Sequence, residues 1–194
     1  MSRASTIKAR PPRGHDRGFF SPPLPRIFAH RGLAIGAPEN TLLAFLKAMS
    51  AGATHVETDV HATLDGVAVI SHDPDLARLV GRNVRVEQFT MAELRRIDLG
   101  DGQSFVSLQE ALDAFPDILF NIDVKSASAA LPTAQAITQA RAIDRVLITS
   151  FSRARRRATV DRLPGVASSA SSDQVLRVIA AARLGLTPLV RRFS

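Results

Sequence analysis

The sequence contains no cysteine, tryptophan or tyrosine. Without cysteine the chain has no disulfide framework and no thiolate chemistry, so any bound metal ion needs oxygen or imidazole ligands. Without tryptophan or tyrosine, the stacking of nucleic-acid bases on aromatic side chains would depend on phenylalanine alone. No apolar run reaches the roughly 18 residues that a membrane-spanning helix needs, and no secretory signal pattern is found. These absences favour a cytoplasmic protein without a membrane span.

Positive charge is distributed unevenly along the chain. The formal net charge is +7, but residues 1–26 hold six basic residues and one acidic residue, together with five of the eleven prolines. This composition predicts a disordered basic leader over residues 1–25 and one folded domain over residues 26–194. The basic residues of the leader and of the stretch "SRARRRA" (152–158) are also compatible with nucleic-acid binding. A solvated helix face explains the arginine run better, so we expect no nucleic-acid partner.

Strand-like and helix-like patterns alternate from Ile27 to Leu184. The six predicted strands are 26–30, 55–62, 67–74, 117–125, 145–151 and 165–171, and the main predicted helices are 40–52, 107–115, 130–142, 152–163 and 172–184. Asn40 is the predicted N-cap of the first helix. Residues 75–105 are polar and irregular apart from a capping box that begins at Thr90. The alternation predicts parallel strands with helical crossovers, in either an open doubly wound sheet or a (β/α)8 barrel. No glycine-rich phosphate loop follows the first strand, which weakens a nucleotide-binding interpretation.

Polar residues cluster where the predicted strands end. They are His30 and Arg31, Glu57 and Asp59, His72 and Asp73, Asp123 and Lys125, and Ser150. Barrel enzymes build their active sites from residues at the carboxyl ends of successive parallel strands. We therefore expect these side chains to share one site.

The residue types in this set favour phosphodiester hydrolysis. Glu57 and Asp59 are two residues apart, so on a strand they lie on the same face, and Asp123 adds a third carboxylate from a later strand. Three carboxylates at one cavity require a hard cation, either Mg²⁺ or Ca²⁺. His30 and His72 come from different strand ends, as a general acid and a general base should.

Positive side chains complete the predicted site, because Arg31 and Lys125 suit an anionic substrate. The remaining histidines, His15, His55 and His61, are expected to be structural.

The chain resembles the glycerophosphodiester phosphodiesterases through "AHRG", "APENT", "GATHVETDVHATLDGVAVISHDPDLAR", "SLQEAL", "FNIDVK" and "ITSF", in this order. The resemblance implies a (β/α)8 TIM barrel of the phosphatidylinositol-phosphodiesterase-like type, which hydrolyses glycerophosphodiesters to glycerol 3-phosphate and an alcohol with a divalent ion. It implies His30 and His72 as the acid/base pair and Arg31 at the phosphate. Residues 75–105 correspond to an insertion near the site.

The resemblance also implies the metal ligands and one further cation. Glu57 and Asp59 are the implied ligands, Glu39 is a loop carboxylate at the metal, and Asp123 and Lys125 take the positions of a third ligand and a charge-stabilising lysine.

Two departures from the family pattern stand out. The third ligand is usually a glutamate, whereas "DVK" supplies the shorter Asp123. A closed barrel also needs eight strands and typically about 250 residues, so six strands indicate a member that is truncated at its C-terminus.

A truncated chain is also compatible with a second hypothesis, a remnant that binds phosphate or a partner chain without catalysis. A third is transphosphorylation as in the sphingomyelinase D toxins, but those are secreted and disulfide-bonded. The alcohol, the choice between Mg²⁺ and Ca²⁺ and the oligomeric state stay open.

Overall fold

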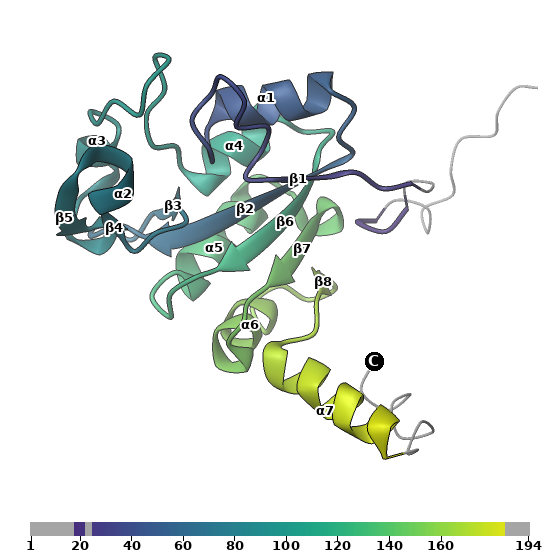
Figure 1. Cartoon of the computed structure of the whole chain (residues 1–194). Coiled ribbons are helices and arrows are strands. Elements are labelled where there is room, and N and C mark those ends of the chain that lie inside the picture. Colours follow the sequence, from purple (N-terminus) through teal and green to yellow (C-terminus); the bar gives the residue numbers. More distant parts are fainter. Residues whose placement is uncertain (1–17, 22–24, 185–194) are drawn as a thin grey trace, which may run out of the picture.

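The main sheet has six strands, in the computed structural model that describes residues 18–21 and 25–184 (Figure 1). Its order is β1 (Phe28–His30), β2 (His55–Ala62), β6 (Leu119–Val124), β7 (Val146–Thr149) and β8 (Ala167–Ser168), with β3 (Ala68–Ile70) beside β2. These five ordered strands are parallel, whereas β3 is antiparallel to β2. The six predicted strands thus match the six strands of this sheet, but only five of them are parallel.

The direction of β3 follows from a tight hairpin. The Thr63 amide donates to the Val67 carbonyl, and the Val67 amide donates to the Thr63 side-chain oxygen, across the turn that contains Gly66, whose φ of +76° suits glycine. The turn is too short for a helical crossover, so the chain reverses and pairs back onto β2. The expectation that His72 ends a parallel strand was therefore wrong. His72 follows an antiparallel strand that returns to the carboxyl-end region of β2, where the Ser71 amide donates to the Asp59 carbonyl at 3.0 Å.

Helices cover one face of the sheet. They are α1 (Leu42–Ser50), α4 (Leu108–Ala114), α5 (Ala130–Gln139) and α6 (Arg153–Val160), and a short 3-10 turn (Ile143–Arg145) precedes β7. Alternate strand residues such as Val56, Phe120 and Ile148 are fully buried in the core with Phe45 of α1. The period of two residues then places the intervening strand residues on the opposite face.

Helix starts follow the predicted chemistry, with one correction. Thr90 and Ser107 form reciprocal capping boxes with Glu93 and Glu110, at the starts of α3 (Met91–Leu94) and α4. The predicted cap of α1 was wrong, because Thr41 and not Asn40 accepts the hydrogen bond from the helix amide.

Residues 75–105 are more regular than the sequence suggested. They form β4 (Asp75–Leu76), α2 (Ala77–Val80), β5 (Arg82–Arg85), a 3-10 helix (Val86–Gln88) and α3 (Met91–Leu94). A separate apolar cluster of Val69, Leu76, Val86, Met91, Leu94 and Phe105 holds this lobe together. Apart from the helix start at Thr90, these elements were not predicted, because they are too short to produce a clear periodic pattern.

Part of the predicted disordered leader is packed. The Phe19 side chain is 2% exposed and its ring meets the His55 ring edge-on at 4.8 Å, while the Phe19 carbonyl lies 3.1 Å from His55 Nε2. Burial of a phenylalanine gives this stretch an apolar anchor that its prolines and charges concealed. Residues 18–21 of the predicted leader are therefore packed at Phe19, whereas residues 1–17 and 22–24 lie outside the described residues.

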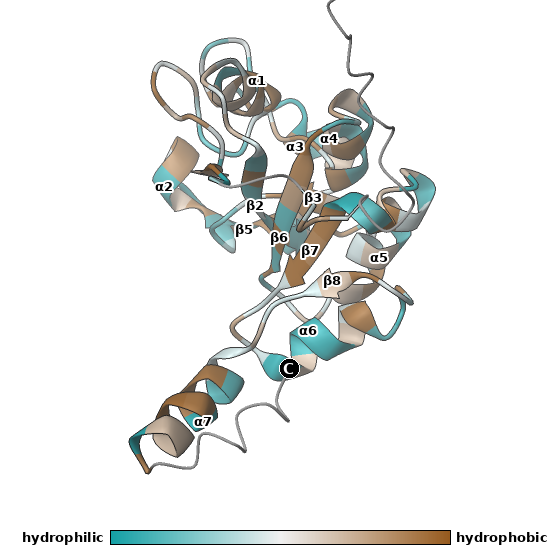
Figure 2. Ribbon diagram, turned by 90° about the vertical axis from the view of Figure 1, so that its right-hand side faces the viewer, coloured by the Kyte–Doolittle hydropathy of each residue, from teal (hydrophilic) through white to brown (hydrophobic). Residues whose placement is uncertain are grey.

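Helix α7 (Ser172–Arg183) projects away from the sheet (Figure 1). Its apolar residues Val175, Leu176 and Ile179 are exposed, and Figure 2 shows the apolar colour along this helix. The outer strands β1 and β8 each pair on one side only in the described part of the chain. Among the residues described, no helix combines the length and apolar character needed to span a membrane.

Candidate active site

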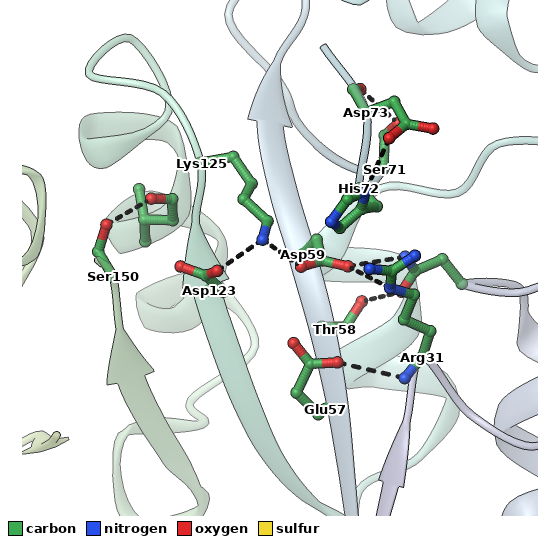
Figure 3. Close-up of polar contacts among 12 residues, drawn as sticks. Arg31, Glu57, Thr58, Asp59, Ser71, His72, Asp73, Asp123, Lys125 and Ser150 are labelled. Atoms are coloured by element: carbon green, nitrogen blue, oxygen red, sulfur yellow. Dashed lines mark hydrogen bonds and ion pairs between the residues drawn. The ribbon is translucent and has the colours of Figure 1, made fainter. Parts of the chain in front are cut away.

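The polar face of the sheet carries the predicted site in two rows. The strand register places His30, Glu57 and Asn121 side by side in one row. The next row toward the carboxyl ends holds Asp59, Asp123 and Thr149. Strand pairing alone therefore brings residues from four strands to one face, as Figure 3 shows for the carboxylates.

Lys125 bridges the two aspartates of the second row. Its Nζ lies 2.9 Å from Asp59 Oδ1 and 2.7 Å from Asp123 Oδ2 (Figure 3). Burial acts to lower the pKa of Lys125, but the hydrogen bonds to Asp123 and Asp59 outweigh it and raise that pKa. Lys125 is therefore a permanently charged part of the site.

Arg31 leaves β1 with a left-handed backbone, φ 58°. This turn aims its backbone amide at Glu57 Oε2, 3.2 Å away. Its guanidinium lies 3.3 Å from Asp59 Oδ2 and donates to Glu39 Oε1 at 3.1 Å. The side chain is 17% exposed, so part of it stays accessible to a substrate.

Asn40 is a site residue that the sequence interpretation assigned to helix capping. Its backbone is left-handed (φ 57°), its amide donates to Asp59 Oδ2 at 3.1 Å, and its side-chain oxygen accepts from Thr58 at 2.8 Å. Asparagine tolerates this conformation better than most residues, and its position beside Glu39 is the signal that could have identified it.

His72 is held by its neighbour. His72 Nδ1 lies 2.7 Å from Asp73 Oδ1, and the imidazole side chain is 33% exposed. His72, Glu39 and Asn40 line one small cavity together with Leu79 and other apolar residues of the 75–105 lobe. The lobe therefore borders the site, as expected.

His30 and Glu57 form the most open part of the site. His30 Nε2 lies 3.8 Å from Glu57 Oε2, and its side chain is 72% exposed. Burial and then the charge of Asp59 raise the pKa of Glu57 to about 7. The surroundings of Glu57 therefore disfavour its charged form, first through burial and then through the negative charge of Asp59.

The charge balance of the site fits a divalent cation. Five carboxylates, namely Glu39, Glu57, Asp59, Asp73 and Asp123, face three cationic side chains, Arg31, Arg78 and Lys125. In addition, Asp123 Oδ1 is buried and has no hydrogen-bond partner. Hard oxygen donors, an orphaned carboxylate oxygen and an excess of negative charge match what Mg²⁺ or Ca²⁺ requires. Within the described residues, no three acidic or histidine side chains already stand close enough together to enclose an ion.

The other predicted residues fall outside this site. His55 is fully buried beside Phe19, and His61 is buried with Nε2 3.3 Å from the His72 carbonyl, so both serve the structure as expected. Ser150 is also buried, and its hydroxyl donates to the Val124 carbonyl at 2.8 Å. His15 lies outside the described residues.

Comparison with known proteins decides the family. The sequence profile of the glycerophosphoryl diester phosphodiesterase family matches residues 30–193. The chain belongs to this family. It is 45% identical over 159 residues to the probable glycerophosphodiester phosphodiesterase 2 of Mycobacterium tuberculosis, covering 81% of this chain and 60% of that protein. It is 34% identical over 139 residues to a glycerophosphodiester phosphodiesterase of Caldanaerobacter subterraneus, covering 64% and 57%.

Solved structures agree on the fold. A glycerophosphoryl diester phosphodiesterase domain from Mycobacterium tuberculosis matches with a TM-score of 0.73 and 27% identity, over 82% of this chain and 65% of that one. A phosphodiesterase of Oleispira antarctica, in complex with the product sn-glycerol 3-phosphate, matches with a TM-score of 0.69 and 26% identity, over 80% and 71%. The fold is therefore part of a TIM barrel. The chain spans about 60% of the length of the curated relatives described above.

Proposed function

We propose that this chain carries the catalytic groups of a metal-dependent phosphodiesterase, which hydrolyses a small glycerophosphodiester to glycerol 3-phosphate and an alcohol. The observation that carries the proposal is the row of Asp59, Lys125 and Asp123, with Arg31 and Glu57 beside it. These groups combine cation ligands with phosphate-binding charge on one face of the barrel sheet.

The proposed roles follow from what each side chain contacts. Arg31 has a guanidinium that is partly exposed at the edge of the site, where it can hold a phosphate oxygen. His30 and His72 are accessible imidazoles, His30 beside Glu57 and His72 beside Asp73. One imidazole takes a proton from the attacking water and the other gives a proton to the oxygen of the leaving alcohol.

The proposed ligands of the cation are Glu57, Asp59 and Asp123, with Glu39 at the edge. The ion, Mg²⁺ or Ca²⁺, would supply positive charge to the phosphate oxygens. Asp59 and Asp123 now share the ammonium of Lys125, so we expect metal affinity to depend on how these three side chains divide their charge.

The test is release of glycerol 3-phosphate from glycerophosphocholine, with Mg²⁺, Ca²⁺ or EDTA. The chain should be compared with His72→Ala and with a form extended by its downstream reading frame. We expect metal-dependent turnover, with a loss of at least about a hundredfold in His72→Ala and no matching loss of metal affinity. Turnover that is seen only in the extended form would support the alternative hypothesis, in which this chain is an inactive remnant. No turnover in either form would contradict the proposed activity.

We also propose that the chain is located in the cytoplasm, which fractionation of cells that produce a tagged chain would test.

A further inference from the structure

Arg78 of α2 joins two parts of the site that are distant in sequence. Its Nε donates to Asp73 Oδ2 at 2.5 Å, and its Nη2 donates to Glu39 Oε1 at 2.5 Å. Asp73 is the residue after His72, whereas Glu39 lies in the loop between β1 and α1. One planar guanidinium therefore sets the position of both carboxylates.

The contact with Asp73 has a consequence for His72. Asp73 uses Oδ2 for Arg78 and Oδ1 for His72 Nδ1, 2.7 Å away. Partial burial acts to raise the pKa of Asp73, but hydrogen bonds from His72 and Arg78 outweigh it, so that pKa is lowered. An ionised carboxylate only accepts hydrogen bonds, so His72 Nδ1 carries the proton and Nε2 is the atom left for proton transfer.

Arg78 is itself placed by the lobe. Helix α2 is a single turn that ends at Gly81 in the left-handed conformation. Leu76, directly before α2, is fully buried in the apolar cluster of the lobe, and Leu79 packs against that cluster. Arg78 thus links the packing of the lobe to Asp73, the residue that contacts His72 Nδ1.

We propose that Arg78 is a positioning residue for His72, which it orients by holding Asp73. The proposal rests on the proposed function, because it assigns His72 a proton-transfer role. Arg78 is the means by which the 75–105 lobe adjusts the catalytic histidine.

Arg95 provides a matched control. Its side chain is 49% exposed, as is that of Arg78, and it also joins the lobe to the barrel through an ion pair, with Glu110 at 2.6 Å. This pair does not involve a site residue. A general loss of lobe attachment should therefore affect Arg95→Met and Arg78→Met alike.

The kinetic test compares these two variants on glycerophosphocholine. We expect Arg78→Met to lower kcat roughly tenfold with KM changed less than about twofold, the scale of one lost charge-assisted hydrogen bond. Arg78→Lys should lie between Arg78→Met and the unmodified chain, and Arg95→Met should match the unmodified chain. In the background of Asp73→Asn, Arg78→Met should have little further effect. Full additivity of the two changes, or equal losses in Arg78→Met and Arg95→Met, would overturn the proposal.

A spectroscopic test does not depend on turnover. Long-range ¹H–¹⁵N spectra report which imidazole nitrogen carries the proton, and the His72 signals are assigned by their loss in His72→Ala. The unmodified chain and Arg95→Met should show the Nδ1–H form of His72, and Arg78→Met should show a mixture of both tautomers. An unchanged His72 tautomer in Arg78→Met would overturn the proposal. An inactive chain that shows the expected tautomer shift would contradict only the proposed function.

Discussion

Asp123 lies where the resemblance to the family implies a glutamate ligand. It has one oxygen on Lys125 and one without a partner, both largely buried. A shorter ligand than glutamate suits Ca²⁺ better than Mg²⁺, because Ca²⁺ accepts looser distances and ligand numbers.

The first prediction concerns Asp123 as a proposed ligand of the cation. Asp123→Asn should weaken the affinity for Mg²⁺ and Ca²⁺ at least about tenfold, because it removes a charged ligand but little volume. Asp123→Glu should keep binding and shift preference toward Mg²⁺. Calorimetric titration measures both, with Asp113→Asn on the exposed surface of α4 as the control. Unchanged affinities in Asp123→Asn would remove Asp123 from the proposed ligands.

The second prediction concerns Glu57, whose pKa is raised from 4.5 to about 7. The folded chain keeps this proton over a pH range in which the unfolded chain has lost it. The contribution of Glu57 to the free energy of unfolding therefore falls as pH rises from 4.5 to about 7. Above about pH 7 this contribution no longer changes with pH.

Glu57→Gln should remove this fall. In EDTA at pH 8 the variant should be more stable than the unmodified chain by up to about 3 kcal/mol, and near pH 4 the two should agree. Urea unfolding at both pH values is the measurement, with the exposed Glu87→Gln as the control. Equal stabilities of Glu57→Gln and the unmodified chain at pH 8 would show that the surroundings do not disfavour the charged form of metal-free Glu57.

At the scale of single elements, the stretch around Phe19 attaches to the start of the barrel strands. Phe19 is buried against His55 and contacts Phe28 with ring centroids 6.1 Å apart, whereas its neighbour Phe20 is 59% exposed. Phe19→Ala should lower the free energy of unfolding by about 3 kcal/mol, as large-to-small core substitutions do. Phe20→Ala should cost less than about 1 kcal/mol. Chemical denaturation of both variants checks this, and equal losses would mean that Phe19 is not an anchor.

At the scale of the whole molecule, the apolar stripe of α7 faces solvent. Val175, Leu176 and Ile179 are exposed on one helix that extends from the body (Figure 2). Contiguous exposed apolar surface favours association. Leu176→Lys should therefore reduce self-association in sedimentation velocity at micromolar concentration and leave the melting temperature within about 2 °C. Leu131→Lys, an exposed leucine on α5, should not reduce it. A chain that is monomeric throughout would contradict this expectation.

The sequence by itself determined the family, the positions of the strands and the face of the strands on which the proposed carboxylate ligands lie. Short-range patterns carry this information, because the alternation in "HVETDVHA" and "FNIDVK" places Glu57, Asp59 and Asp123 on one face of their strands. The apolar residues between them point to the helices for the same reason. Capping boxes at Thr90 and Ser107 are equally local.

Only the tertiary structure decided which neighbours those residues have. The chain reverses at a turn so that β3 pairs back onto β2. Three further contacts join positions that are distant in sequence: Asn40 with Asp59, Arg78 with Glu39, and Phe19 with His55. Such contacts depend on how elements pack against one another, and no periodic pattern along the chain encodes them. The ammonium of Lys125 lies between two carboxylates for the same reason, since strand register across the sheet brings Asp59 beside Asp123.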